Sequence, residues 1–146
     1  MTLVSHRTGC RYAGRLLALA ASSGLGLGLG ASAWAADTSA AQQLSHWSAQ
    51  AGTPGRAEVG RTFFNQTHGG EWSCASCHGT PPTRAGKHAS TGKTIAPLAP
   101  SANPKAFTDS ARVDKWLRRN CKDVLSRECS AQEKADVLAY LVGVKP

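Results

Sequence analysis

The sequence Cys74-Ala75-Ser76-Cys77-His78 constrains this chain more than any other feature. Two cysteines separated by two residues and followed directly by a histidine form the C-x-x-C-H pattern at which haem c is attached. On one helical turn the two thiols can reach the two vinyl groups on one porphyrin edge, and the imidazole then becomes the proximal iron ligand. A zinc site would need a second ligand pair, and a thioredoxin-like pair would need a βαβ context; the sequence offers neither. The motif occurs once, so it predicts one covalently attached haem, bound through Cys74, Cys77 and His78.

The first 35 residues have the pattern of a secretory signal peptide. Arg7, Arg11 and Arg15 precede an uncharged apolar run, 16–33, which ends at the A-x-A pattern Ala33-Trp34-Ala35. The run approaches the length that spans a membrane, but its many small residues and the A-x-A exit favour cleavage over a membrane anchor. We expect cleavage after Ala35, with Ala33 as the second choice. Because no adjacent arginine pair is present, the general secretory route is expected, and the mature protein would be periplasmic.

Residues 36–146 then form one small monohaem domain. The leader removes three of the 17 basic residues and none of the 9 acidic ones, which leaves a net charge of +5. Outside the cytoplasm this charge does not indicate nucleic-acid binding; it either attracts an acidic redox partner or an anionic membrane face, or simply keeps the protein soluble. The remaining cysteines are even in number, so each is expected to be committed to a bond; they are Cys74, Cys77, Cys121 and Cys129.

Helical periodicity predicts an all-α fold, because no strand-like alternation is found. Residues 36–52 are polar and alanine-rich, and form either a short helix or a loose arm. Thr53-Pro54 is typical of a helix start, with Thr53 as N-cap. The apolar positions of 56–66 share one helical face, and Gly69-Gly70 is expected to end that helix.

The second half of the domain begins with a long loop. Segment 79–104 is rich in Pro, Gly, Ser and Thr, and we expect it to wrap around the haem. Thr108 or Asp109 can cap the next helix, which is predicted to run to about Asn120. Ser130-x-x-Glu133 is a capping box that opens the last helix. The apolar stripe of that helix consists of Val137, Leu138, Tyr140, Leu141 and Val144.

The second axial ligand cannot be methionine in the mature protein, because Met1 is the single methionine and lies in the leader. The remaining candidates are His46, His68, His88, several lysines and Asn120. His68 lies too close before the motif, and His46 lies in the polar arm. In small haem domains the distal ligand typically comes from the connection between the last two helices. Here that connection is expected to run from Asn120 to Cys129, and it contains no histidine.

A disulfide between Cys121 and Cys129 would close a loop of about nine residues, worth ~2–3 kcal/mol on the chain-entropy model. It would staple a small domain, and it would also fix Asn120 near the iron. A neutral carboxamide oxygen is a weak ligand that reduction of the iron should weaken further, which opens the position to a diatomic gas. From the residues alone Asn120, an open site and His88 remain alternatives.

The residues resemble the sphaeroides haem protein family, an unusual class I cytochrome c with a small helical domain around one covalent haem. The resemblance covers nearly all of 36–146. It is carried by the haem motif, by Thr83-Arg84-Ala85-Gly86, by the segments 95–101, 107–113 and 115–121, and by Cys129 with Glu133-Lys134-Ala135-Asp136.

This resemblance implies that Asn120, which directly precedes the first disulfide cysteine, is the sixth ligand of the oxidised protein. It implies that Asn120 leaves on reduction, so that oxygen, nitric oxide or carbon monoxide can bind. A dihaem cytochrome c and a membrane b-type cytochrome are the implied electron partners.

Two wider class I features are also implied. Gly60 and Phe64 would lie where the first core helix crosses Val137 and Tyr140 of the last one. Either Pro97 or Pro100 would offer a backbone carbonyl to the His78 ring.

Three functions compete. The leading hypothesis is a redox-gated haem protein that accepts electrons from a cytochrome and binds a gas when reduced. The second is a plain electron shuttle, which the missing methionine disfavours. The third is an enzyme, either a small oxygen or nitric oxide reductase or a peroxidase, for which no distal acid–base group is evident although Arg119 and Lys122 are near Asn120. We expect electron transfer and gas binding rather than catalysis.

Overall fold

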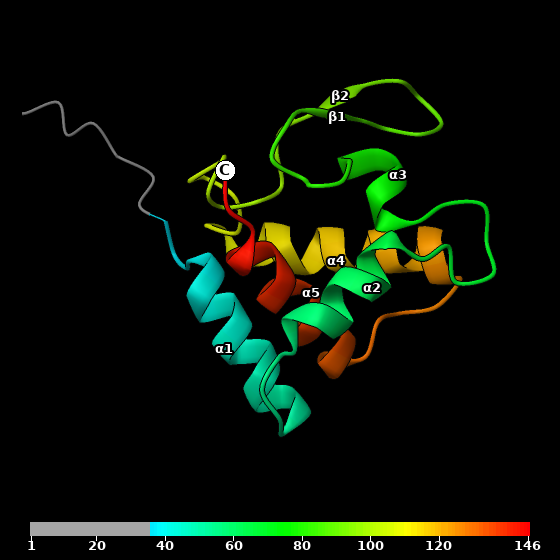
Figure 1. Cartoon of the computed structure of the whole chain (residues 1–146). Helices are drawn as coiled ribbons and strands as arrows, with labels where there is room; N and C mark the ends of the chain where they lie inside the picture. The colour runs from blue at the N-terminus through cyan, green and yellow to red at the C-terminus, as the bar shows by residue number, and fades with distance from the viewer. Residues whose placement is uncertain (1–35) are drawn as a thin grey trace, which may run out of the picture. The chain divides into compact units, whose positions relative to one another are not determined.

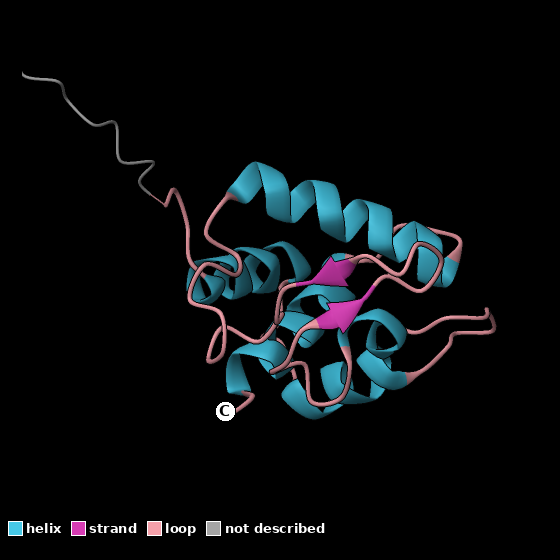
Figure 2. Ribbon diagram, turned by 90° about the horizontal axis from the view of Figure 1, so that it is seen from above, coloured by secondary structure: helices cyan, strands magenta, loops and turns pink. Residues whose placement is uncertain are grey.

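Two helices, α1 (Ala40–Ala51) and α2 (Ala57–Asn65), pack against the C-terminal helix α5 (Ala131–Gly143). Between α2 and α5 the chain forms the short helix α3 (Cys74–His78), the strands β1 (Gly86–Lys87) and β2 (Thr94–Ile95), and helix α4 (Ser110–Leu125). This computed structural model describes residues 36–146; the predicted signal peptide, residues 1–35, lies outside the described residues. Figure 1 shows α3 between the β1–β2 hairpin and α2, and Figure 2 shows how small the strands are beside the helices.

The crossing of α2 and α5 forms the core of the domain. Phe64, Val137, Tyr140 and Leu141 make a buried cluster, in which the Phe64 and Tyr140 ring centroids lie 5.5 Å apart. The two backbones touch at Gly60, where a Cβ atom would lie 1.8 Å from the carbonyl oxygen of Asp136. The predicted crossing of these two helices is therefore confirmed.

The start of α2 differs from the prediction that Thr53 caps it, because the helix begins at Ala57. Arg56 donates its backbone N–H to Asp136 Oδ1 at 2.7 Å, and its guanidinium donates to Asp136 Oδ2 at 3.0 Å. The Asp136 carboxylate of α5 thus accepts a hydrogen bond from the backbone at the start of α2. A local N-cap, Thr53, was expected to supply the acceptor there. Thr53 instead hydrogen-bonds to Gln132.

The end of α2 also differs from the prediction. The helix stops at Asn65, because Gln66 is extended with φ −82° and ψ 148°. Gly69-Gly70 therefore lies beyond the helix, in the turn that leads to α3. Here His68 and Gly69 both have positive φ, at 51° and 85°.

The first and last helices largely follow the prediction. Of the two open possibilities for residues 36–52, the structure has a helix, which Ser39 caps by accepting from the Gln42 N–H. The capping box of α5 is confirmed: the Ser130 hydroxyl accepts from the Glu133 N–H at 3.2 Å, and the Ser130 N–H donates to Glu133 Oε2 at 2.8 Å.

Helix α4 is longer than predicted. Asp109 is its N-cap and accepts from the Arg112 N–H at 2.8 Å, but the helix continues past Asn120 to Leu125. Asn120 and Cys121 therefore lie on a helix and not in a connecting loop. Cys121 and Val124 are buried, so burial of this last turn outweighs its polar composition.

The long segment 79–104 is mostly loop, as predicted, but it contains an antiparallel hairpin that the sequence did not indicate. Gly86 pairs with Ile95, and Lys87 pairs with Thr94. The described residues are otherwise helices and loops, so the all-α prediction is confirmed apart from these two short strands. No helix within 36–146 is long and apolar enough to cross a membrane.

Candidate functional site

The two motif cysteines and His78 form one short helix whose start is fixed by two serines. The Ser73 hydroxyl accepts from the Ser76 N–H at 3.1 Å, and the Ser73 N–H donates to the Ser76 hydroxyl at 2.9 Å. This capping box stabilises a helix that would be too short to persist alone. It places the Cys74 and Cys77 thiols one turn apart, with His78 next to the second.

His78 lies against the core, with its ring centroid 6.3 Å from that of Phe64. Burial lowers the pKa of His78, because it disfavours the charged imidazolium. The buried Nδ1 atom finds no hydrogen-bond partner within 36–146. We expected Pro97 or Pro100 to supply one, but the Pro97 carbonyl instead accepts from Asn103 at 2.8 Å. Because burial favours the neutral form of the His78 ring, its nitrogen lone pair is suited to bind a metal.

The two motif cysteines form no disulfide and are half-buried. Burial raises the pKa of the Cys74 thiol to about 11, so this group is a protonated thiol at neutral pH. Reactive pairs in disulfide oxidoreductases have the opposite property, a lowered pKa. No group of three or more possible metal ligands gathers here or elsewhere in 36–146. The environment of Cys74 thus resembles a packed attachment point more than a redox-active dithiol.

The β1–β2 hairpin holds the other end of α3. The Ala89 N–H donates to Cys77 Sγ at 3.3 Å. A Cβ atom on Gly86 would lie 2.0 Å from the Cys77 carbonyl oxygen, so β1 touches the backbone of α3. The sequence did not indicate that Gly86 and Ala89 support α3, because a single glycine does not stand out in a loop rich in glycine and proline.

Asn120 lies on α4, apart from the three motif residues on α3. It is half-buried and shares the inward helix face with Val113 and Leu117, seven and three residues earlier. The structure therefore brings Cys74, Cys77 and His78 together in one helix, and places Asn120 on another.

The other candidate ligands have different partners. His46 lies on α1 with its ring edge-on to Trp47, and His68 Nε2 donates to the Phe63 carbonyl at 2.8 Å. His88 lies in the hairpin turn, where its Nδ1 accepts from the Thr91 N–H at 3.3 Å.

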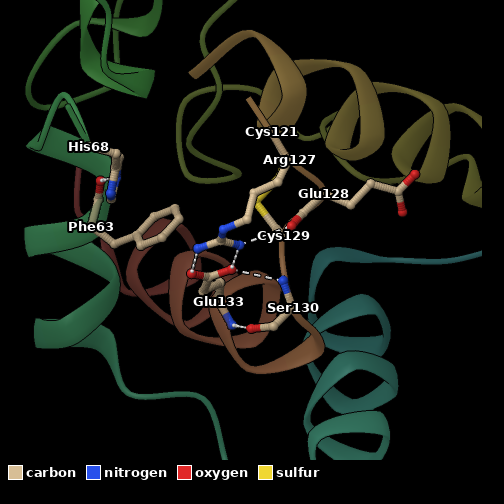
Figure 3. Close-up of a disulfide and its surroundings, with 8 residues drawn as sticks. All are labelled: Phe63, His68, Cys121, Arg127, Glu128, Cys129, Ser130 and Glu133. Carbon is tan, nitrogen blue, oxygen red and sulfur yellow. Dashed lines mark hydrogen bonds and ion pairs between the residues drawn. A yellow bond between two sulfur atoms is a disulfide. The ribbon is translucent and has the colours of Figure 1, made fainter. Parts of the chain in front are cut away.

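A disulfide joins Cys121 of α4 to Cys129, just before α5. Beside it, Arg127 donates to the two carboxylate oxygens of Glu133 at 2.8 and 2.6 Å. The hydrogen bond from Arg127 is the main reason that the pKa of Glu133 lies below its ordinary value. In Figure 3 the Arg127 side chain extends past the disulfide to Glu133, and the Phe63 ring points toward the same ion pair. Cys121, the residue that follows Asn120, is therefore linked covalently to Cys129.

Comparison with known proteins identifies the family. The family model described as "Domain of unknown function (DUF1924)" matches residues 50–141. Cytochrome c-type protein SHP of Cereibacter sphaeroides is 55% identical over 113 residues, which are 75% of this chain and 87% of the relative. The chain belongs to the SHP family of c-type cytochromes.

Solved structures of SHP-like cytochromes have the same fold. Oxidised SHP, described as an oxygen binding cytochrome c, superposes with a TM-score of 0.67 at 55% identity, covering 72% of this chain and 96% of that one. Oxidised cytochrome c'' from Methylophilus methylotrophus gives a TM-score of 0.64 at 35% identity, covering 73% and 95%. This member of the SHP family is therefore a class I cytochrome c with covalently attached haem c. The single C-x-x-C-H motif makes it a monohaem protein.

The donor atoms of α3 fit this cofactor. Two thiols one turn apart match the two attachment points of haem c, and the adjacent imidazole matches its proximal ligand. Haem-ligating histidines normally use their second nitrogen in a hydrogen bond, and the buried Nδ1 atom of His78 has no such partner within 36–146, so this atom adds nothing to the fit.

Proposed function

We propose that this protein is an exported cytochrome that accepts an electron from another cytochrome and then binds a diatomic gas such as oxygen or nitric oxide. Cys74 and Cys77 would attach its haem c, and His78 and Asn120 would be the residues that bind the iron. The relative described as an oxygen binding cytochrome c supports this proposal. The observation that carries it is the half-buried Asn120 on the inward face of α4, beside the anchored Cys121.

Each protein group has a separate role in this proposal. A bound haem c supplies an iron that gains or loses one electron and binds a small gas where a coordination position is open. His78 is kept neutral by burial, so its nitrogen lone pair is available as a permanent ligand. Asn120 offers a neutral amide oxygen, a hard and weak donor that suits the oxidised iron better than the reduced one. The disulfide limits how far Asn120 can move.

The structure offers weaker support to His88 as the second ligand. Its hairpin packs against α3, the helix that carries His78. Its Nδ1 already accepts from Thr91, and the Ser90 hydroxyl lies 3.2 Å from the same atom. Methionine is absent from residues 36–146. To bind the iron, His88 would have to give up these contacts within its own turn, which is why we favour Asn120.

Carbon monoxide tests the proposal. The holoprotein is reduced with dithionite, its absorption spectrum is recorded, and carbon monoxide is added. We expect the gas to change the spectrum of the reduced protein only. Asn120→Ala should convert the oxidised spectrum to a high-spin or water-ligated one, while His88→Ala, the matched control, should leave it unchanged. A reduced wild-type spectrum that carbon monoxide does not alter would favour a plain electron shuttle instead.

Export is part of the same proposal and has its own test. Secreted protein should begin at Ala36, or at Trp34 if the second choice is used, and intact mass measurement distinguishes the two. Retention of residues 1–35 in membrane-bound protein would favour the anchor.

A further inference from the structure

Helix α4 is strongly basic and carries a partly exposed aromatic ring. The helix has five basic residues, Arg112, Lys115, Arg118, Arg119 and Lys122, and only two acidic ones, Asp114 and Asp123. Its net charge of +3 is more than half of the +5 carried by residues 36–146. Trp116 is 40% exposed, which makes it one of the most exposed large apolar side chains in the described residues.

Lys115 and Arg119 flank this indole ring. Lys115 Nζ lies 5.9 Å and Arg119 Cζ 5.6 Å from the ring centroid, both within cation–π range. No carboxylate of the described residues forms an ion pair with either cation. By contrast, Arg118 and Lys122 on the same helix both lie within 4.0 Å of Glu128. Trp116, Lys115 and Arg119, here called the α4 patch, therefore combine an apolar ring with two uncompensated charges.

The composition of the α4 patch matches that of interaction hot spots. Tryptophan and arginine are enriched at the energetic centres of protein interfaces. Two uncompensated cations favour a partner surface of carboxylates, because such a surface would accelerate encounter and fix its orientation. Trp116 also lies four residues before Asn120, and therefore one helical turn from the proposed axial ligand. A partner docked here would lie beside the redox site.

We propose that the α4 patch is the docking surface for the electron donor, a redox protein that presents a cluster of carboxylates around its own cofactor. This inference rests on the proposed function, since it supplies the surface through which the reducing electron arrives. Lys115 and Arg119 pair with the acidic surface, and the Trp116 indole provides the apolar contact at its centre.

The hairpin is the competing surface. Lys87 and Lys93 are exposed there, near Cys77, and they form no ion pair within the described residues. This allows a matched comparison. The variants Lys115→Glu/Arg119→Glu and Lys87→Glu/Lys93→Glu change the net charge by the same amount on two different surfaces.

The experiment measures reduction of the oxidised holoproteins by a reduced dihaem cytochrome c of acidic surface, in a stopped-flow instrument at several salt concentrations. At low salt we expect the α4 double variant to react about tenfold more slowly, or slower still, and to lose most of its salt dependence. The hairpin double variant should change by less than about threefold, because its charges would lie outside the contact with the partner. Equal slowing of the two variants, or greater slowing of the hairpin variant, overturns the proposal.

Trp116→Ala tests the apolar part of the patch. It keeps both cations, so we expect weaker binding of the dihaem cytochrome with an unchanged salt dependence and an unchanged absorption spectrum. A spectrum altered like that of Asn120→Ala would show instead that the ring supports the haem site, which contradicts a docking role.

Two controls separate this inference from its alternatives. Reduction by photoreduced lumiflavin, a small uncharged donor, should have the same rate in all variants, which would show that the redox site itself is unchanged. If the α4 double variant loses binding to phosphatidylglycerol vesicles but retains its rate with the cytochrome, the patch binds membranes and the proposal fails. Dithionite and carbon monoxide bypass docking, so gas binding that persists while the docking prediction fails would leave the proposed function intact.

Discussion

The carbonyl oxygen of Asp136 occupies the space that a side chain on Gly60 would need, 1.8 Å from an ideal Cβ position. No rotamer change can relieve this overlap, because the atom in the way belongs to the backbone of α5. Gly60→Ala must therefore push α2 away from α5 and open the core around Phe64. We expect a loss of about 3 kcal/mol in unfolding free energy, the upper range for overpacking. Urea unfolding of the holoprotein measures it.

Gly143→Ala is the matched control for that substitution. Gly143 ends α5, and an added Cβ would meet nothing within 4 Å. Because alanine is the better helix former, the change should be neutral or stabilising by ~0.5–1 kcal/mol. Similar losses of unfolding free energy at both positions would mean that the α2–α5 contact does not explain the effect of Gly60→Ala.

The Asp136 carboxylate predicts an acid-sensitive step in stability. Burial raises its pKa, but hydrogen bonds from Arg56 and Gln132 outweigh that effect and hold the pKa below its ordinary value. The folded state therefore favours the ionised carboxylate. The resulting stabilisation is present at neutral pH and is lost as the pH falls below the unfolded value of about 3.9 and through the lower folded one.

Asp136→Asn should thus cost about 1–3 kcal/mol at pH 7, the usual range when a buried acceptor loses its charge. The difference from wild type should shrink as the pH falls below about 4, because wild type then loses the same charge. Glu58→Gln is the control: its pair with Arg61 is solvent-exposed on both sides and should contribute less than about 0.5 kcal/mol. A pH-independent difference for Asp136→Asn would contradict this explanation.

Local patterns predicted the parts of this fold that depend on local interactions. The spacing of Cys74, Cys77 and His78 matches one helical turn, and Ser130 with Glu133 forms the capping box that the residue pattern indicates. The N-cap of α2 could not be found in this way, because its acceptor, Asp136, is 80 residues away from Arg56. A long-range carboxylate outweighed the local Thr53-Pro54 signal.

The candidate site shows the same division. The sequence indicated that the three motif residues share one helical turn, as they do in α3. The support of Cys77 by Gly86 and Ala89 depends instead on tertiary contact and leaves no periodic pattern. The end of α4 was predicted too early, because its last turn looks polar in sequence while two of its side chains, Cys121 and Val124, are buried in the structure. Because Asn120 lies on a helix, the direction of its side chain is set by helix geometry as well as by the disulfide at the next residue.

The disulfide should contribute mainly to stability. Cys121→Ser/Cys129→Ser removes a link between residues separated by 8 positions, for which the chain-entropy model gives ~2–3 kcal/mol. Urea unfolding with and without a thiol reductant checks it, since reductant should destabilise wild type but not the variant. Arg127→Gln is a useful comparison, because its ion pair with Glu133 is partly exposed and should be worth less than about 1 kcal/mol. Equal losses for the two variants would show that the ion pair and not the covalent link fixes this connection.

The contact of Gly86 with Cys77 predicts a change in the redox site without a change in its ligands. A methyl group on Gly86 would lie 2.0 Å from the Cys77 carbonyl oxygen, so Gly86→Ala must displace β1 or the end of α3. Either movement alters the Ala89 N–H contact with Cys77 Sγ, and removing a hydrogen bond from a sulfur near the cofactor shifts its electronic environment. We expect a changed reduction potential with the haem still attached, measured by spectroelectrochemistry and by intact mass. Lys87→Ala, at the exposed neighbouring position of β1, should leave the potential unchanged. If Gly86→Ala also left it unchanged, the hairpin would only cover α3 and would not tune the site.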